Sequence, residues 1–208
     1  MPPVNGRSSL RQEQAARTRR RILDAATRVF EEHGFAGTRI EDVAREAGVA
    51  VPTVYKVFTN KANLLIGAVS QTMAGDDAAP IDAQAWFTEQ LHETDPVRQL
   101  QLVARNARAM YERAGPLLNV LRAAAPLDQE LAQAWDDIAS QRVERSRRTA
   151  RSLAAKAAGH VRLSPDDTAA TLLALTEPEL YTTYTAGKRA PNQYQTWLGD
   201  ILCRSLLA

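Results

Sequence analysis

The sequence lacks the features that would place a protein across or outside a membrane. None of its apolar runs approaches the roughly 20 residues that a transmembrane helix needs, so we expect no membrane span. The first 21 residues are polar and basic, without the apolar stretch of a secretory signal. Cys203 is the only cysteine, which excludes an internal disulfide and suits a reducing compartment. These absences predict a cytoplasmic protein.

The patterns of most catalytic and metal sites are missing as well. The three histidines, His33, His92 and His160, are scattered and show no spacing typical of metal ligands. There is no Ser/His/Asp arrangement, no glycine-rich phosphate loop and no Glu-x-x-His pairing. We therefore expect no metal, no cofactor and no catalytic residues. An enzyme on a helical scaffold is the disfavoured alternative, which the detection of turnover would revive.

Strand signals are also absent, because no convincing period-2 alternation occurs along the chain. Hydrophobic residues make up 45% of the 208 residues, enough for a sizeable core, and they recur at helical spacing. We predict an all-α fold of about nine to ten helices. It consists of an N-terminal three-helix domain with a helix-turn-helix and a larger helical domain.

The N-terminal domain is predicted over residues 12–75, after a disordered tail at 1–11. Its first helix ends at Gly34, a C-terminal cap. A capping box from Thr38 to Glu41 is expected to open the second helix. Gly48 stops that helix, Pro52 opens the third, and Thr59-Asn60 caps a fourth helix that begins at Lys61.

The C-terminal domain is predicted over residues 80–208, because Gly75 to Pro80 is the best boundary candidate. Proline and glycine residues separate its expected helices, which cover residues 82–93, 96–113, 116–124, 128–158, 165–187 and 191–206.

Two short helices joined by a turn at Gly48 form the predicted helix-turn-helix. Ala44 and Ala47 are small enough to let the helices approach closely, while Val54 and Phe58 anchor the second helix. This leaves an outward surface made of Val51, Pro52, Thr53, Tyr55 and Lys56. The spacing favours DNA binding by this surface, and a purely structural three-helix unit is the alternative.

The residues from Gly34 to Lys61 resemble the signature of the tetracycline-repressor (TetR) family. The shared elements are Thr38 at the start of the second helix, Ala44-x-x-Ala47-Gly48-Val49, Thr53-x-Tyr55-x-x-Phe58 and Lys61. Ala50 replaces the usual capping Ser, and Val51 and Pro52 replace commoner basic or small residues. The resemblance continues more weakly to the C-terminus.

The resemblance implies which residues meet DNA. Thr38, Tyr55 and Lys61 are expected to contact phosphates, whereas Val51, Pro52, Thr53 and Lys56 lie where family members meet bases. Arg39 joins this expected set. Arg17, Arg19, Arg20 and Arg21 form a basic stretch that could grip phosphates or enter the minor groove, or else a solvated helix face. Residues 1–61 hold 11 Lys and Arg against 7 Asp and Glu, which adds modest support.

The resemblance also implies a homodimer and a small-molecule effector of unknown identity. The helices at 128–158 and 165–187 would form a four-helix interface between two chains, with a monomer as the alternative. The Arg-rich run 142–151 is interpreted as a solvated face or as inter-subunit ion pairs. Aromatic, apolar and polar residues suggest an effector pocket; the candidates are Trp86, Phe87, Met110, Tyr111, Leu118, Arg122, Trp135, Tyr181 and Tyr184.

Together these features predict a transcriptional repressor that an effector releases from a palindromic, double-stranded operator. An activator, or a dimeric DNA-binding protein without a ligand, is the alternative, and a C-terminal domain filled by side chains would favour it.

Overall fold

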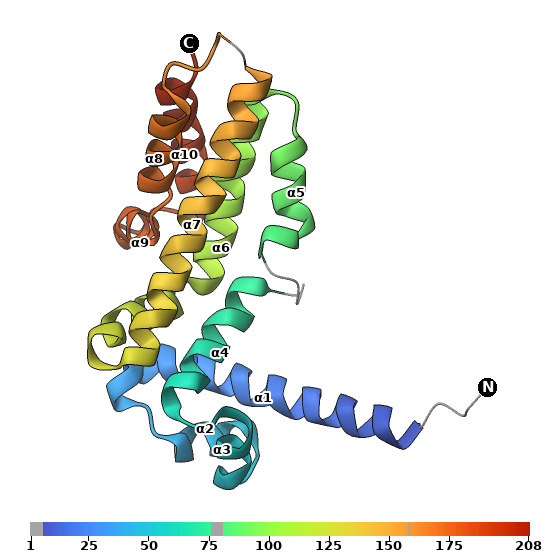
Figure 1. Cartoon of the computed structure of the whole chain (residues 1–208). Helices are drawn as coiled ribbons and strands as arrows, with labels where there is room; N and C mark the ends of the chain where they lie inside the picture. The colour runs from blue at the N-terminus through green and yellow to red at the C-terminus, as the bar shows by residue number, and fades with distance from the viewer. Residues whose placement is uncertain (1–5, 76–80, 158) are drawn as a thin grey trace, which may run out of the picture. The chain divides into compact units, whose positions relative to one another are not determined.

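The structure is a computed structural model that describes residues 6–75, 81–157 and 159–208. Ten α-helices occur within these ranges (Figure 1). Extended pairing in the described part is limited to one antiparallel bridge between Val161 and Leu207, so the all-α prediction is confirmed. None of the described helices is both long and apolar enough to cross a bilayer.

The chain forms two compact units, and each draws on two stretches of sequence. The first unit comprises the residues up to Thr72 together with Asn119–Gln133. The second comprises Met73–Leu118 and Ala134–Ala208. The predicted boundary at Gly75 to Pro80 lies almost wholly outside the described residues, and it stays a prediction.

The first unit is built mainly from four helices, which are α1 (Gly6–Gly37), α2 (Ile40–Ala47), α3 (Val51–Phe58) and α4 (Lys61–Ala74). Its core contains the apolar stripe predicted for the first helix, with Ile22, Ala25, Ala26 and Phe30 all inaccessible to solvent. Side chains from the other helices close this core, including Val43, Val54, Phe58, Leu64 and Leu65.

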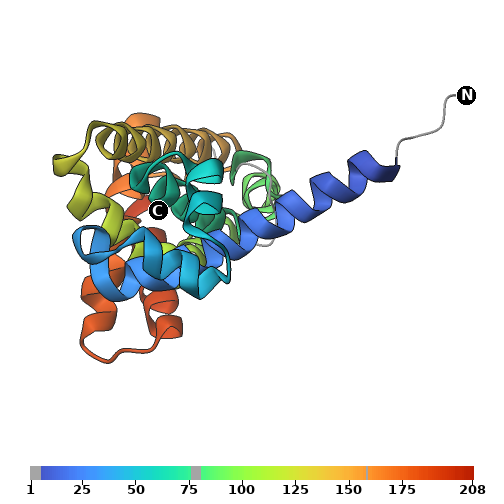
Figure 2. The same ribbon diagram turned by 90° about the horizontal axis from the view of Figure 1, so that it is seen from below.

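Helix α1 is longer than predicted at both ends. It begins at Gly6, so helix covers residues that we assigned to the disordered tail; no stop signal lies between Gly6 and Gln12. Figures 1 and 2 both show its first part extending beyond α2–α4. Gly34 interrupts the helix with a positive φ of 66°, as a cap residue would, but one further turn follows to Gly37.

The predicted capping box at Thr38 is wrong, because α2 begins at Ile40 and its N-cap is Arg39. The Thr38 hydroxyl instead donates to the Gly34 carbonyl at 2.7 Å, within the core. The other end of α2 is as predicted, since Gly48 adopts the left-handed conformation. The Asn60 cap is confirmed by a 2.7 Å hydrogen bond from the Asn63 amide to Asn60 Oδ1.

The other described residues form six helices and two 3₁₀ turns, at Ile81–Ala83 and Ala125–Leu127. The helices are α5 (Ala85–His92), α6 (Pro96–Ala124), α7 (Gln129–Lys156), α8 (Pro165–Leu175), α9 (Pro178–Ala186) and α10 (Pro191–Leu206). In the second unit, α5 lies next to α6 and α8 lies beside α7 (Figure 1), while α10 packs against α6, where Gly199 faces Ala104.

Two prolines act differently from the prediction. Pro116 was expected to separate two helices, but α6 continues through it. Pro116 is exposed, whereas its neighbours Ala114, Leu117 and Leu118 are at most 2% exposed, so packing outweighs the lost hydrogen bond. Pro178 lies inside the single helix predicted over residues 165–187, yet it separates α8 from α9, because the residue before a proline avoids the helical conformation.

Gly48→Ala is expected to lower the free energy of unfolding by about 1–2 kcal/mol. An alanine is strained at a φ of 63°, and its Cβ would lie 2.9 Å from Arg21 Nη2. Gly187→Ala is the matched control, since Gly187 has a φ of −78° and open space around it. Urea unfolding followed by circular dichroism measures both variants, and equal losses would contradict the special requirement at Gly48.

Candidate functional site

The corner between α2 and α3 is fixed by backbone and side-chain hydrogen bonds. The Val49 amide donates to the Ala44 carbonyl at 2.9 Å, which closes the turn around Gly48. Arg21 Nη2, from α1, donates to the Ala47 carbonyl at 2.6 Å. These bonds join α1, α2 and the turn that leads into α3, so the backbone just before α3 is fixed relative to α1 and α2.

Helix α3 buries one face in the core of the first unit and exposes the opposite face to solvent. Val54 and Phe58 are 1% and 4% exposed, as predicted for its anchors. On the opposite face Pro52, Tyr55 and Lys56 are exposed, with Tyr55 at 46%, and Val51 and Thr53 are half-buried. The predicted recognition residues therefore share one accessible surface, which we call the α3 surface.

Thr38 and Lys61 were both expected to contact phosphate. In the structure their side chains instead donate hydrogen bonds to carbonyls of the first unit. Thr38 is 3% exposed, and its hydroxyl is bound to Gly34. Lys61 Nζ donates to the carbonyls of Phe35 and Thr38 at 2.8 and 3.1 Å and lies 4.5 Å from the Phe35 ring centroid. These bonds stabilise the connection between α1 and α2. The resemblance in sequence did not indicate this internal role.

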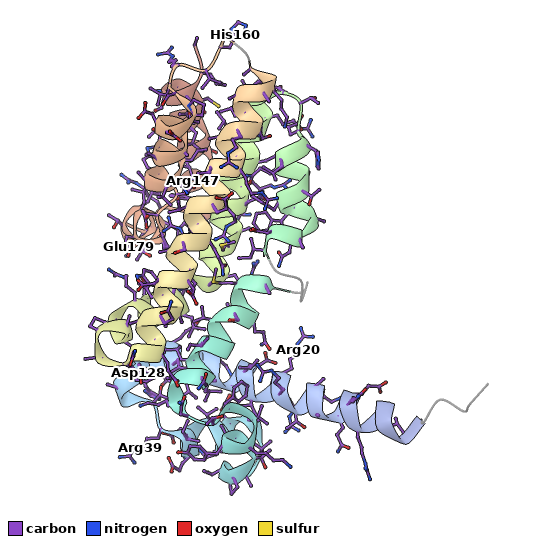
Figure 3. All side chains as sticks on the ribbon, in the orientation of Figure 1. Arg20, Arg39, Asp128, Arg147, His160 and Glu179 are labelled. Carbon is purple, nitrogen blue, oxygen red and sulfur yellow. The ribbon has the colours of Figure 1, made fainter. Side chains whose placement is uncertain are left out.

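The arginines at positions 17, 19, 20, 21 and 39 are all exposed, but only two of them make a contact within the unit that holds the side chain. Arg19 lies over the Phe58 ring at 4.5 Å, and Arg21 holds the corner. Arg17, Arg20 and Arg39 are exposed, and Figure 3 shows Arg20 and Arg39 projecting from the ribbon. Among the described residues, no ion pair joins these three arginines or Lys56 to a carboxylate. These four side chains therefore carry positive charge without an ion-pair partner among the described residues.

A cavity of about 100 Å³ lies within the second unit, lined by Met73 near the end of α4 and by residues of α5, α6, α7, α8 and the start of α9. Six of the predicted pocket residues line it, namely Trp86, Phe87, Met110, Tyr111, Leu118 and Trp135. Its wall combines aromatic and apolar side chains with a few polar groups, the composition expected of a small-molecule site.

Three other predicted pocket residues are not among those that line this cavity. Arg122 is exposed and belongs to the first unit. Tyr181 and Tyr184 join an aromatic cluster around Tyr194, with ring centroids 5.0 and 5.6 Å from the Tyr194 ring. Tyr194 is fully buried, so this cluster acts as core rather than as cavity wall.

The interpretation of the Arg-rich run as a solvated face or as inter-subunit ion pairs is wrong for Arg142 and Arg145, which pair with Glu177 and Asp82 of the same chain. The two arginine side chains are only 13% and 12% exposed, and both line the cavity. Seven lining positions of α7 follow the i, i+3, i+4, i+7 spacing of one helix face, which are Trp135, Ile138, Ala139, Arg142, Arg145, Ser146 and Thr149. That spacing was the signal in the sequence that could have identified the two arginines.

Arg142 and Tyr111 together hold the break between α8 and α9. Arg142 pairs with Glu177 at 3.0 Å and donates to the Thr176 carbonyl at 3.1 Å. The Tyr111 hydroxyl donates to the same carbonyl at 2.5 Å. Burial raises the pKa of Tyr111, so the phenol remains a donor near neutral pH.

A second polar cluster surrounds Arg145. Arg145 Nη1 lies 3.6 Å from Asp82 Oδ1, while Arg148 Nη1 lies 3.1 Å from the other oxygen of Asp82. Burial lowers the pKa of Arg145, but an arginine stays charged under physiological conditions. Gln90 donates to Thr149 at 3.1 Å and accepts from Asn106 at 3.0 Å, so the amides of this wall are fixed.

The sequence of the first unit matches a known family. Residues 22–68 correspond to the model of bacterial regulatory proteins, tetR family. Over these residues the chain is similar to the tetR family. The matched residues include α2 and α3, so the helix-turn-helix described above lies within the part of the chain that is similar to this family.

Curated relatives share mainly this region. The transcriptional repressor KstR of Mycolicibacterium smegmatis is 35% identical over 75 residues, which are 36% of this chain and 37% of that protein. The chain spans about a third of the length of the curated relatives it matches first.

Solved structures share the fold of both units. A candidate transcriptional regulator from Saccharomonospora viridis, solved with choline, has a TM-score of 0.74 and 20% identity, covering 93% of this chain and 99% of that one. The regulator FadR from Bacillus subtilis, solved with stearoyl-CoA, has a TM-score of 0.70 and 17% identity, with coverages of 89% and 97%.

Lys61→Met is expected to lower the free energy of unfolding by about 1–3 kcal/mol, because the carbonyls of Phe35 and Thr38 lose their donor. Lys56→Met removes an exposed lysine and is expected to change it by less than about 0.5 kcal/mol. Chemical unfolding measures both. Equal stabilities of the two variants would contradict the internal role of Lys61.

Proposed function

We propose that the chain is a DNA-binding transcriptional repressor that acts as a homodimer and is released from its operator by a small molecule. The α3 surface carries this proposal. It exposes Pro52, Tyr55 and Lys56 from a fixed helix, next to basic residues without carboxylate partners. Tyrosine and lysine suit phosphates and base edges, and apolar Val51 and Pro52 suit thymine methyl groups.

Contacts to the DNA phosphates would come from exposed basic residues rather than from side chains that are bonded within the unit. Arg17, Arg20 and Arg39 offer guanidinium groups for phosphates, and Tyr55 offers its hydroxyl. Thr38 and Lys61 support the domain internally, so we do not assign phosphate contacts to their side chains. A dimer would present two α3 surfaces to successive major grooves, about 34–36 Å apart, on a palindromic operator.

The cavity of the second unit supports regulation by a ligand and disfavours the ligand-independent alternative. Helix α7 belongs to both units, since Glu130 accepts hydrogen bonds from Asn60 and Asn63 while Trp135 and Arg142 line the cavity. A bound effector would therefore act on a helix that also contributes to the DNA-binding unit. The proposal involves no catalytic step, and it places the protein in the cytoplasm with the DNA.

Tyr55→Ala and Lys56→Ala are each expected to raise the dissociation constant for the operator about tenfold or more, with little change in stability. Fluorescence anisotropy with a duplex selected from a random pool measures this, with the exposed Arg147→Ala of α7 as the control. Undiminished affinity in both α3 variants would contradict the assigned DNA surface.

Regulation is tested on the same duplex. An effector that occupies the cavity is expected to weaken operator binding about 5–150-fold, the range of ordinary allosteric coupling. Sedimentation velocity should find a dimer in the free and DNA-bound protein. A compound that fills the cavity yet leaves operator affinity unchanged would contradict release by the ligand, and a DNA-bound monomer would contradict the dimer.

A further inference from the structure

We propose that the cavity of the second unit binds a small organic carboxylate with a ring-sized apolar body, and that Arg145 binds the carboxylate. The inference rests on the proposed function only in taking this cavity as the effector site. Its ligand class follows from the charge, the hydrogen bonding and the size of the wall.

The wall of the cavity carries positive charge and no negative charge. Arg142 and Arg145 are among the described lining residues, and none of those residues is Asp or Glu. Both guanidinium groups are nearly removed from water, with side-chain exposures of 13% and 12%. A charge in such a place interacts strongly with a ligand, because little solvent screens it. The cavity therefore favours an anion and opposes a cation.

The two arginines differ in how many of their guanidinium hydrogen bonds are already made within the protein. Arg142 binds both oxygens of Glu177 at 3.0 Å and also donates to the carbonyls of Leu173 and Thr176. Its guanidinium is committed to the α8–α9 connection. It contributes positive charge to the cavity but has little bonding capacity left.

Arg145 is held much more loosely. Its distance of 3.6 Å to Asp82 exceeds the 2.7–2.9 Å or so of a charge-assisted hydrogen bond. Asp82 is also closer to Arg148, so one carboxylate serves two guanidinium groups. The planar fork of Arg145 matches the two oxygens of a carboxylate, and a ligand carboxylate would supply the missing negative charge.

The remaining wall sets the size and character of the ligand body. Trp86, Phe87, Trp135 and Met110 provide aromatic and thioether surface, which suits a flat apolar group. A volume of about 100 Å³ holds about seven to ten water-sized groups, at about 10–15 Å³ for each. This space fits a single ring with its carboxylate and is too small to enclose a long acyl chain.

The test uses three probes of similar size and different charge: benzoate, benzamide and phenyltrimethylammonium. Trp86 and Trp135 line the cavity, so tryptophan fluorescence and calorimetry report binding to the full-length protein without DNA. We expect the dissociation constant of benzoate to be at least about tenfold lower than that of benzamide, with the cation weakest. Benzamide or the cation binding as tightly as benzoate would overturn the proposal, as would the absence of benzoate binding at millimolar concentration.

The matched variants are Arg145→Gln and Arg147→Gln, two positions apart on α7. Arg145 lines the cavity, whereas Arg147 is exposed (labelled in Figure 3). Arg145→Gln is expected to abolish the preference for benzoate over benzamide, and Arg147→Gln to preserve it. Arg145→Lys keeps the charge without the fork, and we expect an intermediate preference. An unchanged preference in Arg145→Gln would overturn the assignment, and the comparison of probes on the unmodified chain does not depend on any variant folding.

Operator binding without any probe separates this inference from the proposed function. A protein that binds its operator but does not discriminate among the three probes contradicts only the ligand class. A protein that prefers benzoate but binds no operator contradicts only the DNA-binding function.

Discussion

The hydrogen bond from Arg21 to the Ala47 carbonyl, together with the left-handed backbone of Gly48, determines how the first unit presents α3. An eight-residue helix is too short to be stable alone, so α3 needs neighbours on both sides. Val54 and Phe58 attach it to the core, and Arg21 holds the preceding turn. The accessible face can then vary in sequence without changing the position of the helix.

Much of the fold could be predicted from local signals. Gly48, Pro52 and the apolar stripe of α1 identified the helix-turn-helix, because each residue acts through its immediate backbone. The errors arose where packing decides. Pro116 does not break α6, because buried neighbours hold that turn of the helix. Thr38 does not cap α2, because α2 begins one residue later than the capping box requires, and its hydroxyl bonds to the Gly34 carbonyl instead.

The cavity was only partly predictable. Trp86 and Trp135 could be predicted as cavity residues because they are aromatic. Tyr181 and Tyr184 are aromatic too, yet they lie in an aromatic cluster of the core, so residue type alone does not separate the two places. A dense run of arginines is usually solvated, and the partner of Arg145 is Asp82, far away in the sequence. Only the tertiary structure brings such a pair together. The helical periodicity of α7 carries part of this information, because it places Arg142 and Arg145 on the face of Trp135.

Asp82 has a special position in the second unit, since it is shared by Arg145 and Arg148 while its side chain is still 43% exposed. An entering carboxylate would exchange with it at Arg145. The Asp82 carboxylate would lose little interaction energy when it leaves Arg145, because it keeps its ion pair with Arg148 and is hydrated more fully. The water of the guanidinium is already removed when the protein folds. Anion capture at this position would thus be an exchange between two carboxylates at a buried guanidinium, and the cost that remains is the desolvation of the ligand carboxylate.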